Sequence, residues 1–369
     1  MRRVFRIPVR LGTRRYEVLI GSGHFSGFGR RVRRLNLGTT PVVLSNSSIL
    51  QRYGSSLKAS LRRAGLSMQV LTVADSERSK SLRTLGRILD RLAGLDGPGR
   101  RLFLILAGGG VVGDLGGVAA GLYRRGIPFV QLPTTLLAQV DSAIGGKTGV
   151  DLPQGKNLVG LFYQPRLVFI EVEFLQTLSD RQFRSGLAEV LKCAVIRDPE
   201  LFRFLERVEV QRLREDPRRL AWVVARAVQV KARVVESDEL ETRGIRTILN
   251  FGHTLGHAIE TAAHYRRDYT HGEAVALGMR AATDMAWRLD LLAASVRTRI
   301  HKALDRLGLP SGIRGLRFSE ILQAMEHDKK WAQGRGLWIL PAGIGRCIVR
   351  RGVPVTVVQA AIRELWKGD

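Results

Sequence analysis

Residues 101–117 read Arg-Leu-Phe-Leu-Ile-Leu-Ala-Gly-Gly-Gly-Val-Val-Gly-Asp-Leu-Gly-Gly. The first seven form an apolar run of strand length, and the glycines that follow open a second apolar segment with helical character. A strand, a glycine turn and a helix can bind a phosphate group. Glycine lets the backbone approach the ligand, and the helix N-terminus presents amide N–H groups. The stretch predicts a nucleotide-binding α/β unit, with a tight turn and close helix packing as the purely structural alternative.

The rest of the chain divides into two parts around this unit. Short apolar strands alternate with helices in the first half, where the alternating apolar residues near the N-terminus predict an edge strand. From Ser179 onward nearly every segment has helical period, including one continuous helix predicted for residues 245–263. We therefore expect a Rossmann-like α/β domain at residues 1–175 and an all-α domain at residues 176–369.

Composition limits the class of protein. Of the 369 residues, 45% are hydrophobic, which predicts a globular chain, and no apolar run reaches membrane-spanning length. The two isolated cysteines and the lack of a signal peptide predict a cytoplasmic protein. The net charge of +26 would suit nucleic-acid binding, but the arginines are spread along the chain. We favour a solvated basic surface and keep nucleic-acid binding as the alternative.

A group of histidines predicts a metal or catalytic site. His253 and His257 are four residues apart, which places both rings on one face of a helix, and His271 begins a later apolar run. Glu189 lies in a largely apolar helical segment, where a carboxylate needs a partner. One glutamate with two histidines is a common open zinc set, but spacing alone does not say which two histidines bind. The structural alternative is a set of partly buried, hydrogen-bonded histidines.

Several motifs together resemble one family along nearly the whole chain. They include Gly-Gly-Gly-Val-Val-Gly-Asp at 108–114, Ser-Gly-Leu-Ala-Glu-Val-Leu-Lys at 185–192, Asn-Phe-Gly-His-Thr-Leu-Gly-His at 250–257 and His-Gly-Glu-Ala-Val at 271–275. Further matches are residues 125–142, 145–149, 155–157 and 328–330. These stretches resemble the 3-dehydroquinate synthase family of the sugar-phosphate cyclase superfamily. The resemblance implies an NAD-binding domain, a helical domain, and an active site between them.

The resemblance also implies roles for individual residues. It makes Glu189, His253 and His271 the ligands of one Zn²⁺ or Co²⁺ ion and His257 the catalytic histidine. The NAD contacts that it implies are Asp75, Glu77, Lys80, Gly110, Val111, Val112, Gly113, Asp114, Thr134, Thr135, Lys147, Lys156, Phe174, Leu175, Gln176 and Thr177. The further catalytic and substrate-binding residues that it implies are Asp141, Lys147, Asn157, Lys192, Lys231, Arg246, Asn250, Lys330 and Arg125, the last reaching across a homodimer interface.

The implied reaction is the second step of the shikimate pathway. NAD transiently oxidises the anionic sugar phosphate 3-deoxy-D-arabino-heptulosonate 7-phosphate, phosphate is eliminated, and NADH returns its hydride before ring opening and an intramolecular aldol reaction. Other NAD- and zinc-dependent cyclases, of the valiolone and deoxyinosose type, are the nearest alternative. Arg246, Asn250 and Lys330 match the dehydroquinate type by the resemblance. A metal-dependent alcohol dehydrogenase, which would accumulate NADH, is a more distant alternative.

Overall fold

The computed structural model describes residues 4–263, 269–326 and 336–366. The chain forms two compact units, one of Met1–Leu178 with Asp216–Leu240 and one of Ser179–Glu215 with Glu241–Asp369. Among the described residues, no helix is both long enough and apolar enough to cross a membrane.

The first unit is built on a seven-stranded sheet with the strand order β1-β2-β9-β6-β5-β3-β4. Every neighbouring pair is parallel except β1 and β2, so the predicted N-terminal edge strand is confirmed. The chain runs from β3 to β4 on one side and then to β5 on the other, which makes β3 and β5 the point where strand order reverses. The strands are β1 (Phe5–Val9), β2 (Tyr16–Gly21), β3 (Thr40–Ser45), β4 (Gln69–Thr72), β5 (Leu102–Gly108), β6 (Phe129–Pro133) and β9 (Leu167–Glu171).

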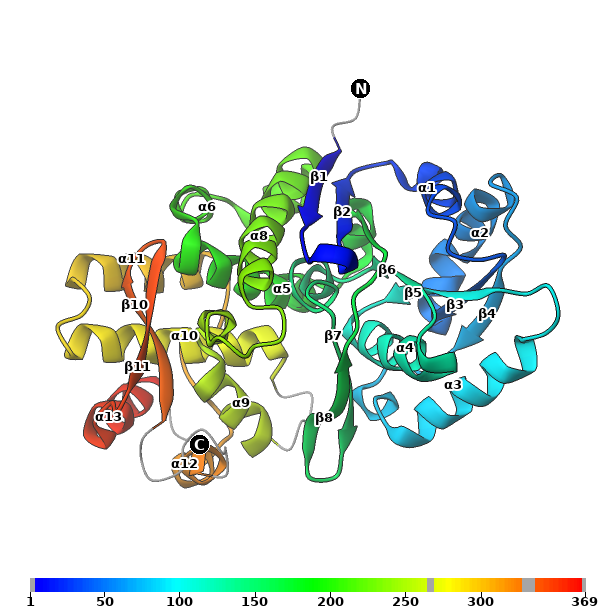
Figure 1. Cartoon of the computed structure of the whole chain (residues 1–369). Helices are drawn as coiled ribbons and strands as arrows, with labels where there is room; N and C mark the ends of the chain where they lie inside the picture. The colour runs from blue at the N-terminus through cyan, green and yellow to red at the C-terminus, as the bar shows by residue number, and fades with distance from the viewer. Residues whose placement is uncertain (1–3, 264–268, 327–335, 367–369) are drawn as a thin grey trace. The chain divides into compact units, whose positions relative to one another are not determined.

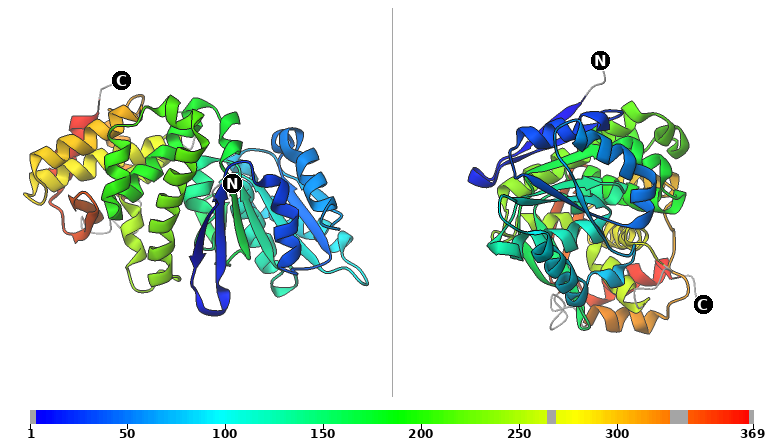
Figure 2. Two further views of the ribbon diagram at one scale, coloured as in Figure 1. Left: turned by 90° about the horizontal axis from the view of Figure 1, so that it is seen from above. Right: turned by 90° about the vertical axis from the view of Figure 1, so that its right-hand side faces the viewer.

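Helices cover both faces of this sheet because β5 is apolar on both sides. Leu104 and Leu106 pack with α3 (Leu82–Leu95) and α4 (Gly110–Leu122), while Phe103 and Ile105 pack with α1 (Phe28–Arg34) and α2 (Ser47–Arg62). Such alternation follows from the two-residue period of a strand. Figure 1 and Figure 2 show α1 and α2 side by side. The predicted Rossmann-like fold class is confirmed for this unit.

Two further elements complete the first unit. A hairpin of β7 (Lys147–Leu152) and β8 (Gly155–Phe162) packs on α4, and α8 (Pro217–Ser237) packs on β1 and β2. The break at Leu178 lies three residues from the predicted domain boundary at 175, but α8 joins the α/β unit instead of the helical one. Buried residues such as Leu220 and Val224 give α8 an apolar face for this packing, which helical period alone could not assign to either unit.

The second unit is mainly helical, as predicted. Its long helices include α5 (Asp180–Arg197), α10 (His271–Arg288) and α11 (Ala294–Arg306). The other described elements are α6 (Pro199–Leu205), α7 (Val210–Glu215), α9 (His253–Ala262), α12 (Phe318–Glu326), α13 (Val355–Leu365) and the hairpin of β10 (Leu337–Gly343) and β11 (Arg346–Arg351).

The single helix predicted for residues 245–263 is wrong. A 3-10 turn, η7 (Arg246–Asn250), is followed by Gly252 with φ of 83°, and α9 begins only at His253. A side chain at Gly252 would be strained by that left-handed backbone and would also meet Met279 Cγ at 2.6 Å. The apolar pattern continues through the turn, which is why periodicity did not reveal the break.

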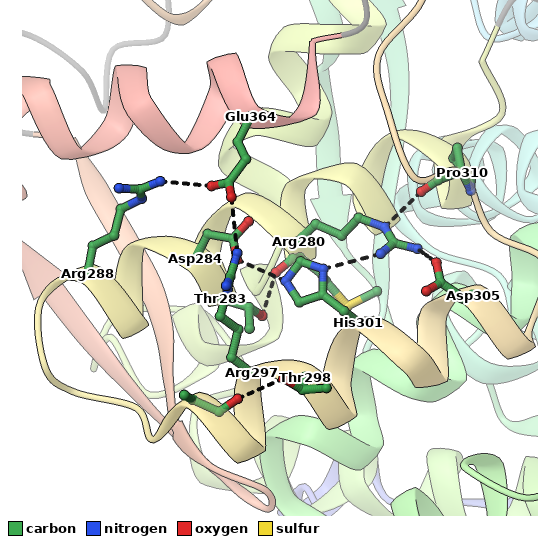
Figure 3. Close-up of polar contacts among 12 residues, drawn as sticks. Arg280, Thr283, Asp284, Arg288, Arg297, Thr298, His301, Asp305, Pro310 and Glu364 are labelled. Carbon is green, nitrogen blue, oxygen red and sulfur yellow. Dashed lines mark hydrogen bonds and ion pairs between the residues drawn. The ribbon is translucent and has the colours of Figure 1, made fainter.

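Buried charged residues join α10 to its neighbours (Figure 3). Arg280 donates to the Pro310 carbonyl at 2.9 Å and to Asp305 at 2.6 Å, and one turn later Asp284 accepts from His301 Nε2 at 3.0 Å. Arg280 and Asp284 are 3% and 1% exposed. Because buried charges must be paired, this network fixes which faces of α10 and α11 meet.

Candidate active site

Glu189, His253 and His271 form a cluster in the second unit that could hold a metal ion. Their ligand atoms all lie within 4.8 Å of one another. Glu189 Oε1 is 3.7 Å from His253 Nε2 and 3.6 Å from His271 Nε2. The structure thus brings together the three residues predicted as ligands. One carboxylate oxygen and two imidazole nitrogens fit a divalent cation such as Zn²⁺ or Co²⁺ and leave a position for substrate.

The three candidate ligands come from three helices that approach closely at glycines. Glu189 lies on α5, His253 begins α9 and His271 begins α10. A Cβ on Gly278 of α10 would lie 1.8 Å from the Gly252 carbonyl oxygen, so only glycine allows α10 to meet the start of α9. The turn that breaks the predicted helix therefore also positions the first ligand histidine.

Burial and the neighbouring charges give the two ligand histidines opposite pKa shifts. Burial, with the nearby Lys192 ammonium, lowers the pKa of His253 to about 3. Burial also lowers the pKa of His271, but the neighbouring carboxylates of Glu189 and Glu260 outweigh it and raise the pKa to about 10. His253 is therefore a neutral imidazole, the form in which histidine binds metal.

His257 lies beside the cluster but on an exposed position of α9. Its ring centroid is 5.3 Å from that of His253 and 6.3 Å from that of His271. The cluster of Glu189, His253 and His271 does not include His257. The exposed His257 ring is accessible to a bound molecule. This arrangement suits a proton-transfer role better than a ligand role.

Basic and polar residues of the second unit accompany the cluster. Lys192 is 1% exposed and forms an ion pair with Glu189 Oε2, one turn earlier on α5. Arg246 is 3% exposed at the start of η7, and Asn250 ends the same turn just before α9. The predicted substrate residue Lys330 lies outside the described residues.

In the first unit, most predicted cofactor residues follow the carboxyl ends of parallel strands. Glu77 and Lys80 follow β4, Gly110 to Asp114 follow β5, Thr134 and Thr135 follow β6, and Phe174 to Thr177 form η6 (Val172–Thr177) after β9. Ligands of open α/β sheets bind at this edge, especially where strand order reverses. The glycine turn after β5 lies at such a reversal, and the predicted helix that follows it, α4, begins at Gly110. The arrangement therefore fits a dinucleotide.

Charged side chains from distant segments meet at this edge. Lys80 Nζ donates to Asp114 Oδ2 at 2.8 Å and to Asn157 Oδ1 at 2.6 Å, and Glu77 lies 3.8 Å from Lys156 Nζ. Burial raises the pKa of Asp114 to about 6, although the Lys80 ammonium opposes the shift. Lys80 is only 4% exposed and holds the β8 hairpin residue Asn157 close to α4.

A second ionic contact joins two predicted substrate residues. Lys231 Nζ, on α8, donates to the Asp141 carboxylate at 2.6 Å and to its backbone carbonyl at 2.5 Å. Asp141 lies in the π-helical turn η5 (Ala138–Ser142), which follows β6. Lys147, predicted for both cofactor and substrate, is exposed at the start of β7, and Asp75 is exposed after β4.

Sequence reasoning missed one carboxylate that contacts the metal cluster. Glu260 lies on α9, is 9% exposed and has Oε2 3.2 Å from His271 Nδ1. It is seven residues after His253, which places it on the same helix face, and that spacing was the available signal.

Comparison with solved structures shows which enzymes share this fold. A 2-deoxy-scyllo-inosose synthase complexed with carbaglucose-6-phosphate, NAD⁺ and Co²⁺ aligns with a TM-score of 0.88 and 27% identity over 98% of this chain and 100% of that one. A 2-epi-5-epi-valiolone synthase from Streptomyces hygroscopicus with NAD⁺ and Zn²⁺ bound aligns with a TM-score of 0.84 and 28% identity over 95% of this chain and 96% of that one. The chain thus shares the fold of sugar-phosphate cyclases.

Sequence relatives narrow this class to one family. Family models described as 3-dehydroquinate synthase N-terminal and C-terminal match residues 70–185 and 186–331. The 3-dehydroquinate synthase of Pelotomaculum thermopropionicum is 45% identical over 94% of this chain and 93% of its own length. The chain belongs to the 3-dehydroquinate synthase family, as the motifs predicted, and the predicted enzyme class is confirmed.

Proposed function

We propose that this protein converts 3-deoxy-D-arabino-heptulosonate 7-phosphate to 3-dehydroquinate and phosphate, with bound NAD and one divalent metal ion. The 45% identity to a 3-dehydroquinate synthase over 94% of the chain carries the proposal. The Glu189, His253 and His271 cluster supplies an independent chemical reason, because the reaction needs a polarised hydroxyl and ketone.

NAD would be held at the carboxyl edge of the first unit's sheet. The backbone N–H groups of Gly110 and Val111 at the start of α4 are suited to its pyrophosphate. Lys80 positions Asp114 beside this turn through their 2.8 Å ion pair. Bound NAD would supply reversible hydride transfer at the substrate carbon that is oxidised. Cofactor contacts are proposed at Asp75, Glu77, Lys80, Gly110 to Asp114, Thr134, Thr135, Lys147, Lys156 and Phe174 to Thr177.

Glu189, His253 and His271 would hold the metal ion. The ion, when bound, supplies Lewis-acid polarisation of the substrate oxygen at the carbon that is oxidised. Glu189 Oε2 pairs with Lys192, so its other oxygen, Oε1, faces the two histidines. Lys192 thereby orients the carboxylate and keeps its charge compensated inside the protein.

The remaining residues would bind the two anionic ends of the substrate and move protons. We assign the substrate hydroxyl proton to His257, because its exposed ring lies beside the ligand histidines. Basic side chains suit the substrate's carboxylate and phosphate because charge-assisted hydrogen bonds are stronger than neutral ones. The proposed set is Asp141, Lys147, Asn157, Lys192, Lys231, Arg246, Asn250, Lys330 and Arg125.

The decisive test follows phosphate release and dehydroquinate formation together, with the heptulosonate 7-phosphate as substrate. Both products should form in equal amounts over many turnovers, while NADH absorbance rises by no more than the amount of bound cofactor. Accumulation of NADH equal to substrate consumed would contradict the synthase proposal and favour a dehydrogenase. Glucose 6-phosphate, offered separately, tests the deoxyinosose alternative, because the similar 2-deoxy-scyllo-inosose synthase is complexed with carbaglucose-6-phosphate.

We also propose that the enzyme is a homodimer, with Arg125 reaching the substrate phosphate across the interface. Arg125 is exposed, with φ of 61°, at the end of η4 (Tyr123–Arg125). Nearby Leu122 is 47% exposed, and Leu158 and Phe162 of β8 are 58% and 41% exposed. Sedimentation analysis should give twice the 41.0 kDa chain mass, and a monomer with full activity would contradict this assignment. A cytoplasmic location and a basic surface that does not serve nucleic acid stay predictions.

A further inference from the structure

The ring of His271 is held between two carboxylates. Its Nε2 is 3.6 Å from Glu189 Oε1, and its Nδ1 is 3.2 Å from Glu260 Oε2. Glu260 lies on α9, one turn after His257, and α9 and α10 lie side by side (Figure 1). Because Glu260 is only 9% exposed, its carboxylate sits in a fixed environment and not in bulk water.

This geometry determines which ring nitrogen is available to a metal. When a metal ion takes the place of one ring proton, the other proton stays on Nδ1, because Nδ1 lies within hydrogen-bond distance of the Glu260 carboxylate, which only accepts hydrogen bonds. The lone pair is then on Nε2, the nitrogen that faces Glu189. The Glu260 carboxylate also increases the electron density that His271 can donate.

The second ligand histidine has a weaker partner. His253 Nδ1 lies 3.3 Å from the backbone carbonyl of Phe251, a neutral acceptor two residues earlier in the chain. Both histidines therefore present Nε2 to the cluster, but only His271 is supported by a charged group. Glu189 and Glu260 thus place two carboxylates around the ligand histidines, and Lys192 forms an ion pair with Oε2 of Glu189.

We propose that Glu260 is a positioning residue of the metal site, which fixes the tautomer and ring orientation of His271 and strengthens its bond to the ion. This inference rests on the metal site of the proposed function. Its prediction concerns metal affinity and ligand field, which are measured without substrate.

The test measures Zn²⁺ dissociation constants by chelator competition in the NAD-bound protein, and the visible absorption of the Co²⁺-substituted protein. Glu260→Ala should weaken Zn²⁺ binding by about 10- to 100-fold, the usual effect of removing such a partner. Glu260→Gln keeps a neutral oxygen acceptor and should fall between wild type and Glu260→Ala. The Co²⁺ bands should shift in both variants, because the orientation and donor strength of His271 change.

Thr254→Val is the matched control. Thr254 is also on α9 and donates to the Leu337 carbonyl at 3.2 Å, so its loss weakens the packing of α9 without touching His271. The control should keep the wild-type Zn²⁺ affinity within about twofold, well below the effect expected for a partner of a ligand histidine. Equal losses in Thr254→Val and Glu260→Gln would overturn the positioning role, as would Glu260 variants with wild-type affinity and spectra. A wild-type protein that binds no Zn²⁺ would refute the metal site itself. This outcome differs from failure of the positioning role of Glu260, in which the wild-type protein still binds Zn²⁺.

Discussion

Replacing Asp284 by Asn tests how far the buried network on α10 stabilises the second unit (Figure 3). The Asp284 carboxylate accepts from Arg297 Nε at 2.5 Å and from His301 Nε2 at 3.0 Å. Asn has nearly the same shape and keeps an oxygen acceptor, but it carries no charge. The change therefore removes the carboxylate charge that the two hydrogen bonds share, without opening a cavity.

The expected loss can be worked from these contacts. A hydrogen bond to a charged group contributes about 1.5–3 kcal/mol and a neutral one about 0.5–1.5 kcal/mol, so two bonds lose about 2–3 kcal/mol together. Breaking a buried ion pair completely would cost about 3–5 kcal/mol. Arg297 keeps a 3.2 Å contact with Glu364 and stacks 4.4 Å above the Trp287 ring. Because Arg297 keeps these partners, we expect a loss of stability of about 2–3 kcal/mol.

The same argument gives the pH dependence. Burial would raise the pKa of Asp284, but hydrogen bonds and charges from His301 and Arg297 outweigh it and hold the pKa below the ordinary value of 3.8. A lowered carboxyl pKa stabilises the folded state above the unfolded value, and this contribution disappears as pH falls through the folded value. The difference between wild type and Asp284→Asn should therefore shrink as pH falls below about 4.

Urea unfolding at fixed metal and NAD concentrations measures the effect, with tryptophan fluorescence as the signal. A loss of about 2.5 kcal/mol should lower the urea midpoint by about 1 M for a slope of 2–3 kcal/mol/M. Asp305→Asn is the control, because Asp305 also binds an arginine of the network but its side chain is 57% exposed, so it should cost at most about 1 kcal/mol. A loss below about 1 kcal/mol in Asp284→Asn, or equal losses in both variants, would refute the reasoning.

Three further predictions use other parts of the chain. Because burial raises the pKa of Asp114 to about 6, Asp114→Asn should increase the free energy of unfolding in denaturant above pH 6. The variant should have no such effect at about pH 3.8 or below, where the carboxyl group is protonated in both the folded and the unfolded protein. His257→Ala should keep metal and NAD, measured by elemental analysis and absorbance, yet slow turnover by about 10²- to 10⁴-fold; loss of the metal would make His257 a ligand instead. Gly278→Ala places a Cβ 1.8 Å from a backbone oxygen and should lower the free energy of unfolding, measured by urea titration, by about 1–3 kcal/mol or more. Gly86→Ala in α3, where no atom lies within 4 Å of the new Cβ, should raise the free energy of unfolding by about 0.5–1 kcal/mol in the same titration.

Local patterns predicted the α/β unit well because its strands are continuously apolar. All seven residues of β5 are buried, and no other soluble arrangement buries both faces of such a strand as simply as a sheet between helices. The glycine turn at Gly109 and the start of α4 at Gly110 followed from the same stretch. The assignment of α8 to this unit was not predictable, because its amphipathic pattern gives a buried face but not the partner of that face.

The metal cluster was predictable in part. The histidine spacing indicated a site, and the resemblance separated the ligands from His257, which spacing could not do. Glu260 was missed because a single acidic residue in an amphipathic helix usually lies in solvent. The ion pairs of Lys80 with Asp114 and of Lys231 with Asp141 join residues 34 and 90 positions apart, so only the fold reveals them.

The start of α10 shows how the segment His-Gly-Glu sets the position of a metal ligand. Gly272 donates its backbone N–H to Ser185 Oγ at 3.0 Å, and a Cβ there would lie 1.9 Å from the Ser185 carbonyl oxygen. Ser185 and Glu189 are four residues apart on α5, so they lie on one face of that helix. The glycine therefore sets how closely His271 approaches Glu189.

Glu273 then holds this end of α10 in place. Its carboxylate accepts from the Thr270 backbone N–H at 2.7 Å, while Thr270 Oγ1 accepts from the Glu273 N–H at 3.3 Å, a reciprocal cap. Arg181, at the start of α5, donates two hydrogen bonds of 2.8 and 2.7 Å to the Glu273 carboxylate. A helix end would otherwise fray, but here the cap and the arginine tie it to the helix that carries Glu189. His271, the proposed ligand at the first position of α10, is thus held in place by its neighbours in sequence, which reduces the ordering cost of binding an ion.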